Sequence, residues 1–418
     1  MCNLHDRYSQ FGCFIVITFR QDSKVFFLTN MYSKLFGERG EFSMSVVYFV
    51  ATGLFQIKLI RLMVYLLLIA NTLGFLAILY QFILDAELVY IIQYGPIISG
   101  STYALGSLYG IIFLRDAEEF QHGFQFWNEH EGSKETQNRI KQHINSLTVS
   151  VILNTALAFV TGTSLILPNK DEIHYHYFIK ILMDLETVPR RLSQALYYLY
   201  KLNFVMMFPI MTINSYRVLY FSRKFKFQVM LLLEHIETLT KNYNVDDINL
   251  FYNTRYQDYI KQKLIFFIRR HSYIAQYVAK INNSIGPFVV LYAISATLLG
   301  VSVLLIVATG TIYYNTYQII LCGAIYLSTI FCAVDGTETV EMESVEIYNK
   351  LLGQPWYTWN NENKRIFVIF LMNCKKPLQI TKFSDTFYVN YDWGIAVLKK
   401  VYSLGSVFFN LRRYIIDK

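Results

Sequence analysis

The chain has 418 residues, of which 54% are hydrophobic and only 16% are charged, and its formal net charge is +8. This balance excludes an ordinary soluble enzyme and favours a protein that crosses a membrane several times. The basic residues follow the pattern of membrane topology rather than a basic patch on a soluble face, so we expect no nucleic-acid partner.

Residues 1–45 are predicted to form a cytoplasmic N-terminal segment without clear periodicity. Their apolar run, Phe11 to Phe19, is followed by Arg20 rather than by a small-residue cleavage site, so it is not a secretory signal. The five cysteines are not placed in extracellular loops by the spans proposed below, and no disulfide framework follows.

Residues 46–336 are predicted to contain six transmembrane helices with a ligand pocket in their outer halves. Each apolar run is long enough to cross a bilayer as a helix. The runs are about Ile57–Leu84, Leu88–Leu114, Ile144–Leu167, Ser193–Phe221, Ser284–Thr309 and Ile312–Val334.

The next segment, residues 337–384, reads as a cytosolic anchor helix. Together with Gln228–Asn283 it has apolar faces and no lipid to cover them, so we expect these parts to pack into a common cytosolic base.

Residues 385–411 are predicted to form a seventh, pore-lining transmembrane helix. A charge at membrane depth costs about 2.5–3.5 kcal/mol, so the charged side must face water or protein. One helical stripe collects Asp385, Asp392, Lys399, Ser403, Ser406 and Asn410. A helix that lines an aqueous path is favoured, and a helix packed in a polar bundle is the alternative.

A pore also needs a gate, and a ring of apolar side chains can close one by dewetting. We expect Val407 to form the constriction, with Leu404 as the second choice, beside Ser403, Ser406 and Asn410. The alternative is that Val407 and Leu404 pack against the fifth and sixth spans.

A ligand site is expected where aromatic and Met side chains gather in the outer halves of the spans. An apolar cavity with a few hydroxyls suits a small, volatile, weakly polar molecule. Ordinary core packing is the alternative for each residue. The candidates are Tyr90, Tyr94, Phe159, Met206, Met207, Tyr314 and Tyr317.

The distribution of charge predicts the orientation of the chain. With a cytoplasmic N-terminus and an extracellular C-terminus, most of the 38 Lys and Arg residues lie on the cytoplasmic side. This polarity is opposite to that of a G-protein-coupled receptor. We find no phosphate loop, nucleophile elbow or zinc signature, and therefore expect neither catalysis nor a cofactor or metal.

The C-terminal segment carries an ordered set of short motifs that resembles the signature of insect odorant receptors. The motifs are Ile347-Tyr348, Trp356-Tyr357, Lys364-Arg365, Lys375-Lys376-Pro377-Leu378, Phe387, Leu398-Lys399 and Val401-Tyr402-Ser403. This resemblance implies an odorant-gated, non-selective cation channel in the plasma membrane of a sensory neuron. It also implies a tetramer in which an odorant-binding subunit joins co-receptor subunits.

Phe408 and Phe409 stand near the place where the co-receptor's pore helix ends with Gln, which favours a ligand-tuned subunit. A gustatory receptor is the nearest alternative, but Val401-Tyr402 is not followed by the Gln-Phe typical of that family. A secondary transporter is less favoured, because the two halves of the chain show no internal symmetry.

Overall fold

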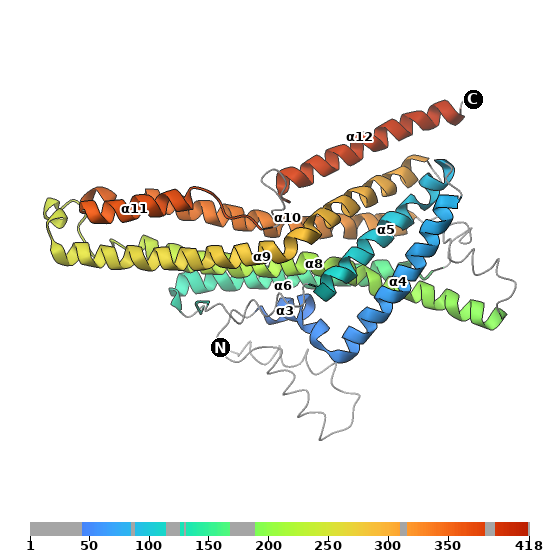
Figure 1. Ribbon diagram of the computed structural model, residues 1–418, viewed down its shortest axis with the longest axis horizontal. Helices are drawn as coiled ribbons and strands as arrows, with labels where there is room; N and C mark the ends of the chain where they lie inside the picture. The colour runs from blue at the N-terminus through green and yellow to red at the C-terminus, as the bar shows by residue number, and fades with distance from the viewer. Residues whose placement is uncertain are drawn as a thin grey trace, which may run out of the picture. The chain divides into compact units, whose positions relative to one another are not determined.

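The computed structural model describes residues 44–84, 88–113, 126–128, 131–167, 189–309, 316–380 and 389–416. The chain divides into two units, Met1–Glu41 and Phe42–Lys418, and all described residues belong to the second. Every regular element in these ranges is a helix, which confirms the prediction of an all-α protein (Figure 1). In a membrane such helices satisfy their own backbone hydrogen bonds.

Each of the seven predicted spans corresponds to one long helix. These are α4 (Lys58–Leu84), α5 (Leu88–Phe113), α6 (Lys134–Ser164), α8 (Arg190–Glu237), α9 (Thr254–Thr309), α10 (Thr316–Leu352) and α12 (Tyr391–Ile416). By length and composition alone, four described segments could cross a membrane: Lys58–Tyr80, Lys134–Ser164, Arg191–Glu237 and Thr316–Leu352. Shorter apolar stretches lie in α5 and α9, at Ile97–Ile112 and Leu291–Leu304.

Helix α4 has two different faces. Its outer face is a stripe of apolar side chains spaced three and four residues apart, all more than half exposed: Leu59, Leu62, Leu66, Ile69, Leu73, Leu76, Tyr80 and Ile83. Its inner face buries Val64 and Ile78. A continuous apolar stripe of this length on a membrane helix is covered by lipid.

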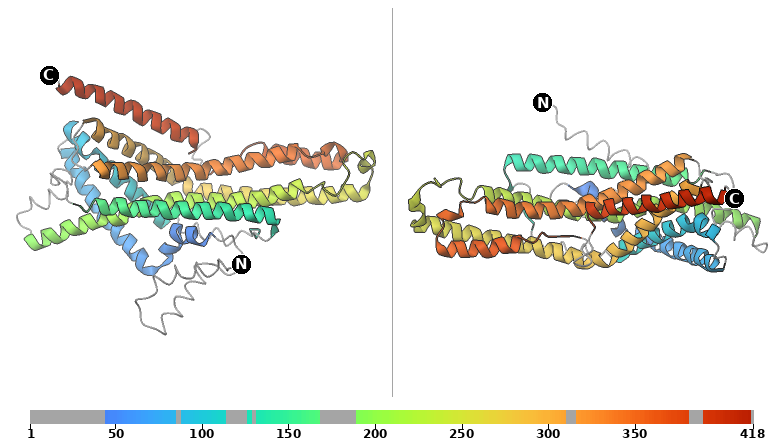
Figure 2. Two further views of the ribbon diagram at one scale, coloured as in Figure 1. Left: turned by 180° about the vertical axis from the view of Figure 1, so that it is seen from behind. Right: turned by 90° about the horizontal axis from the view of Figure 1, so that it is seen from above.

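Helices α8, α9 and α10 continue well beyond membrane length, and Figures 1 and 2 show them extending with α11 (Asn361–Cys374) away from α4 and α5. The predicted boundary after residue 336 lies inside α10, because the helix has no break where its sequence turns polar. The extended parts share a core of large buried side chains. We call it the anchor core: Phe225, Phe227, Tyr256, Phe267, Trp359, Phe367 and Phe370.

Polar contacts tie α11 to α9 at the end of the anchor. The Asn360 side chain caps α11 by accepting a hydrogen bond from the Asn363 backbone at 2.9 Å. Asn363 is fully buried and donates to the Gln257 side chain at 2.9 Å. The backbone N–H of Asn360 donates to the same Gln257 oxygen at 2.8 Å. These bonds fix the start of α11 because a buried amide without partners is costly.

Helix α12 begins at Tyr391, where the Asn390 side chain accepts from the Trp393 backbone at 2.9 Å. It continues to Ile416, beyond the predicted end near residue 411. Residues 381–388, and with them Asp385 of the predicted stripe, lie outside the described residues. Along α12, Val397 and Val401 are buried, and the helix packs against α9.

Candidate functional site

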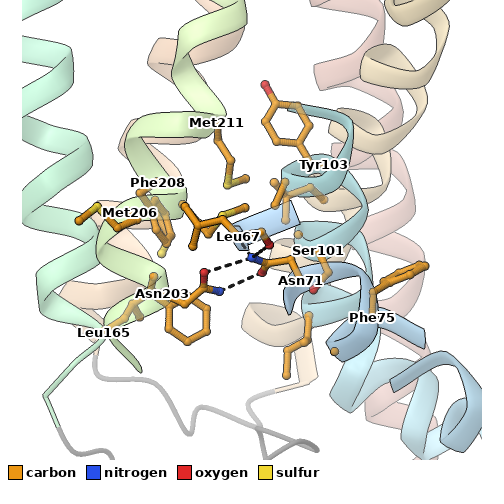
Figure 3. A pocket seen from close by; sticks show the side chains of 18 of the residues that line it. Leu67, Asn71, Phe75, Ser101, Tyr103, Leu165, Asn203, Met206, Phe208 and Met211 are labelled. Carbon is orange, nitrogen blue, oxygen red and sulfur yellow. Dashed lines mark hydrogen bonds between the residues drawn. The ribbon is translucent and has the colours of Figure 1, made fainter. Parts of the chain in front are cut away.

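A cavity of about 660 Å³ lies among the membrane parts of α4, α5, α8, α9 and α10 (Figure 3). Its volume is in the range of pockets that hold small organic ligands. Most of its lining is apolar, including Leu67 and Phe75 from α4, Met211 from α8 and Ile325 from α10. Such a lining favours a ligand that is itself mostly apolar.

Small residues and a proline help to keep this space open. A Cβ added at Gly74 of α4 would meet no atom within 4 Å, and one at Gly100 of α5 would meet Leu299 only at 3.8 Å. Pro209 lies inside α8 beside the cavity-lining residue Phe208. Since proline cannot donate a backbone hydrogen bond, it interrupts the regular helix at the cavity wall.

Further along α5 from the cavity-lining residue Ala104, α5 and α9 approach closely through glycines. A Cβ at Gly110 would lie 2.7 Å from the Tyr292 hydroxyl, and one at Gly106 would lie 3.3 Å from Leu291. The close approach lets the Tyr292 hydroxyl donate to the Gly106 carbonyl at 2.9 Å, while the Asn214 side chain donates to the Ser107 carbonyl at 3.1 Å. Glycines in membrane helices permit this kind of contact between neighbours.

Two asparagine side chains are the clearest polar feature of the cavity. Asn71 on α4 donates to Asn203 on α8 at 3.1 Å, and Asn203 donates back to Asn71 at 2.9 Å. Asn71 also donates to the Leu67 carbonyl at 2.8 Å. Figure 3 shows the two amides facing each other within the apolar lining.

Two sets of side chains lie between the lining of the cavity and α12. A smaller cavity of about 80 Å³ shares Tyr103 and Thr329 with the larger one and touches Trp393 of α12. In addition, a Cβ at Gly300 of α9 would lie 2.6 Å from the Tyr326 hydroxyl and 3.3 Å from Val401 of α12. Gly300 therefore lies between a cavity-lining side chain and the last helix.

The predicted ligand residues fall in different places. Met206 and Met207 of α8 line the cavity, whereas Phe159 and Tyr317 are partly exposed and do not belong to its lining. The structure describes the backbone of α5 at residues 90 and 94 but not the side chains of Tyr90 and Tyr94, and Tyr314 lies outside the described residues.

The predicted pore residues lie on the half of α12 that follows Val401. Ser403, Leu404 and Val407 are exposed in the single chain, with Val407 at 52%, and Ser406 is half-buried. Asn410 belongs to the helix, but its side chain lies outside the described residues.

Neither Asn71 nor Asn203 is among the ligand residues predicted from the sequence. A signal was available for Asn71, because a single amide inside a long apolar helix is costly and therefore marks a polar contact or a functional site. Among the described residues, no group of His, Cys, Asp or Glu side chains is arranged to hold a metal ion.

These helices and this mostly apolar space define a multi-pass membrane protein with a cavity suited to a small molecule. The sequence profile of the family described as "7tm Odorant receptor" matches residues 105–402. The chain belongs to this odorant receptor family, which is a family of receptors and not of enzymes.

Solved structures have the same fold. The insect olfactory receptor OR5 from Machilis hrabei matches with a TM-score of 0.65 at 10% identity, covering 92% of this chain and 99% of that chain. The same receptor in complex with eugenol matches with a TM-score of 0.59 at 11% identity, covering 88% of this chain and 96% of that chain. Comparison with curated protein sequences gave no match.

Proposed function

We propose that the chain is the odorant-binding subunit of a ligand-gated, non-selective cation channel, and that a small volatile molecule binds in the 660 Å³ cavity. The cavity carries this proposal, because a mostly apolar space of this size has no evident structural purpose. Family membership supports it, as does the complex of the structurally similar OR5 with eugenol. Met206 and Met207 contribute adaptable apolar contacts to this site.

In this proposal the N-terminus is cytoplasmic, the C-terminus is extracellular and the anchor core lies in the cytosol. The bias of Lys and Arg supports this orientation. Helix α12 lines the pore, with Val407 or Leu404 at its constriction. The exposure of both side chains in the single chain supports this role, since a pore-lining side chain must not be buried within its own subunit.

The pore forms by assembly with co-receptor subunits into a heterotetramer in the plasma membrane of a sensory neuron. Helix α11 supports such an assembly, because it exposes Val368, Ile369 and Met372, the last at 70%. These side chains belong to the anchor, where no lipid covers them in the proposed orientation. An exposed apolar patch of this kind is typical of an interface between subunits.

The test is co-expression of the chain with an insect odorant co-receptor and recording of odorant-evoked current. We expect a cation current that needs both subunits and a ligand. The matched control is Leu73→Ala, on the lipid-facing stripe of α4 and outside the cavity lining, which leaves sensitivity unchanged. Met207→Ala shifts the dose–response curve. Silence to a broad odorant panel contradicts the proposal. Solute flux without a ligand-gated current also contradicts it, and favours a transporter.

A further inference from the structure

The Asn71–Asn203 pair joins two side-chain amides in a cavity whose lining is mostly apolar but also includes Ser101, Thr212 and Gln318. The two side chains come from α4 and α8, which are far apart in sequence, and they exchange two hydrogen bonds of 3.1 and 2.9 Å. Asn71 also contacts the Leu67 carbonyl and the sulfur of Met207. Burial of an amide side chain among apolar groups costs free energy unless the amide is hydrogen-bonded. The bonds between Asn71 and Asn203 reduce this cost for both side chains.

Counting the donors and acceptors of the two amides shows which hydrogen-bonding group remains available to a ligand. A side-chain amide has two N–H donors and an oxygen with two acceptor positions. Asn71 uses its donors on Asn203 and on the Leu67 carbonyl. Asn203 uses one donor on Asn71, and within the described ranges of the chain no acceptor takes its second N–H.

We propose that the Asn71–Asn203 pair is the specificity element of the cavity and selects neutral, mostly apolar ligands that carry one hydrogen-bond-accepting oxygen. This inference rests on the proposed function of the cavity as the odorant site. The free N–H of Asn203 donates to the ligand oxygen without breaking the pair, while the apolar lining holds the rest of the molecule. A ketone, aldehyde or ester has the required chemistry.

The hydrogen bonds between Asn71 and Asn203 limit how strongly the cavity can prefer a ligand with an oxygen over an apolar analogue. A site whose polar groups are left unpaired rejects an apolar analogue very strongly. Here both amides remain hydrogen-bonded to each other when an apolar molecule is bound, so an alkane incurs no such penalty. The ligand oxygen gains about one hydrogen bond, which corresponds to a preference of roughly three- to tenfold.

The experiment compares dose–response curves for a straight-chain ketone and the alkane of matched length, using the chain with its co-receptor. We expect the ketone to be more potent by roughly three- to tenfold in the unmodified receptor. The double variant Asn71→Leu with Asn203→Leu replaces both amides by apolar groups of similar size, and we expect it to abolish the preference. A preference that survives in the double variant overturns the proposal.

Asn154→Leu is the matched control, because Asn154 is a buried amide in α6 outside the cavity lining, and we expect it to retain the ketone preference. Loss of the preference in this control as well contradicts the assignment to the pair. Should the double variant fail to reach the cell surface, ketones with the carbonyl moved along the chain are compared on the unmodified receptor. Potency must depend on carbonyl position, and equal potencies contradict the proposal.

Failure of the proposed function is recognised separately. If no compound evokes current, thermal unfolding of the purified chain is measured with the ketone and with the alkane. A larger stabilisation by the ketone that is lost in the double variant supports the amide pair even though the channel proposal fails. Equal stabilisation by the two compounds, or none by either, contradicts the inference about the pair.

Discussion

Helices α8, α9 and α10 pass through two regions with opposite packing. In the anchor, large side chains such as Trp359 and Tyr256 are fully buried. In the membrane half, the same helices surround 660 Å³ of space together with α4 and α5. The first region buries its large side chains against one another, and the second keeps a cavity.

The difference in packing indicates that the anchor holds the helices together and that the membrane half can accept a ligand. The anchor joins its helices by a filled core and by ion pairs, including Lys226–Glu343 at 2.8 Å and Lys350–Glu237 at 2.6 Å. The membrane half keeps volume that a ligand can fill, beside Gly300 and the last helix. We therefore expect substitutions in the anchor to change stability and those around the cavity to change the response to ligand.

The largest effect is expected for Trp359→Ala in the anchor core. Trp359 is 0% exposed and packs edge-on against Phe367 at 5.1 Å, so its truncation costs about 3–5 kcal/mol of unfolding free energy. Trp356→Ala is the control, because Trp356 is 46% exposed and its loss changes stability by about 0.5 kcal/mol or less. Thermal unfolding of both purified variants measures the difference, and equal losses contradict the role of the core.

Gly300→Ala is expected to have an intermediate effect. The new methyl group would clash with Tyr326 and press on Val401, displacing the Tyr326 hydroxyl from the Ala296 carbonyl at 2.8 Å. Overpacking of this kind costs about 1–3 kcal/mol. We expect a lower maximal ligand-evoked current at equal surface expression.

Gly323→Ala on α10 is the matched control, since a Cβ there meets no atom within 4 Å. It should leave the maximal current unchanged. Identical currents from the Gly300 and Gly323 variants would show that the contact between α9, Tyr326 and α12 has no part in the response.

Val407→Ala is expected to alter basal leak or conductance with little effect on folding. Val407 is half exposed in the single chain, so stability changes by about 0.5 kcal/mol or less. Leu398→Ala is the control, because Leu398 is similarly exposed on α12 but lies outside the polar stripe. Single-channel recording distinguishes them, and normal conductance in both variants places the gate elsewhere.

The smallest effect is expected for the pH dependence of the stability of the anchor. Burial lowers the pKa of His271, whose ring lies 5.6 Å from Phe370, below the ordinary value of 6.5. Between the lowered pKa and 6.5 the unfolded chain binds a proton that the folded chain does not, so stability falls as pH drops below 6.5. Thermal unfolding across this range should be less pH-dependent in His271→Phe. An unchanged pH profile contradicts this cause.

The helices could be predicted from sequence because each apolar run is far longer than a strand and matches the thickness of a bilayer. The extension of α8 and α10 into the anchor was harder to see, since each helix crosses from apolar to polar sequence without a stop signal. Asn71 and Asn203 are 132 residues apart, so no local spacing predicts their pairing. Met206 and Met207 were accessible to prediction because they lie on one helix within a Met-rich run.

The most direct test of ligand binding in the cavity is photolabelling of the assembled receptor with a diazirine analogue of an activating ketone, followed by mapping of the adducts. We expect adducts on cavity-lining residues such as Leu67, Met207 and Ile325, which excess unlabelled ketone suppresses. Adducts confined to the anchor, or to stripe residues of α4 outside the cavity lining such as Leu73 and Leu76, and insensitive to competition, would contradict ligand binding in the cavity.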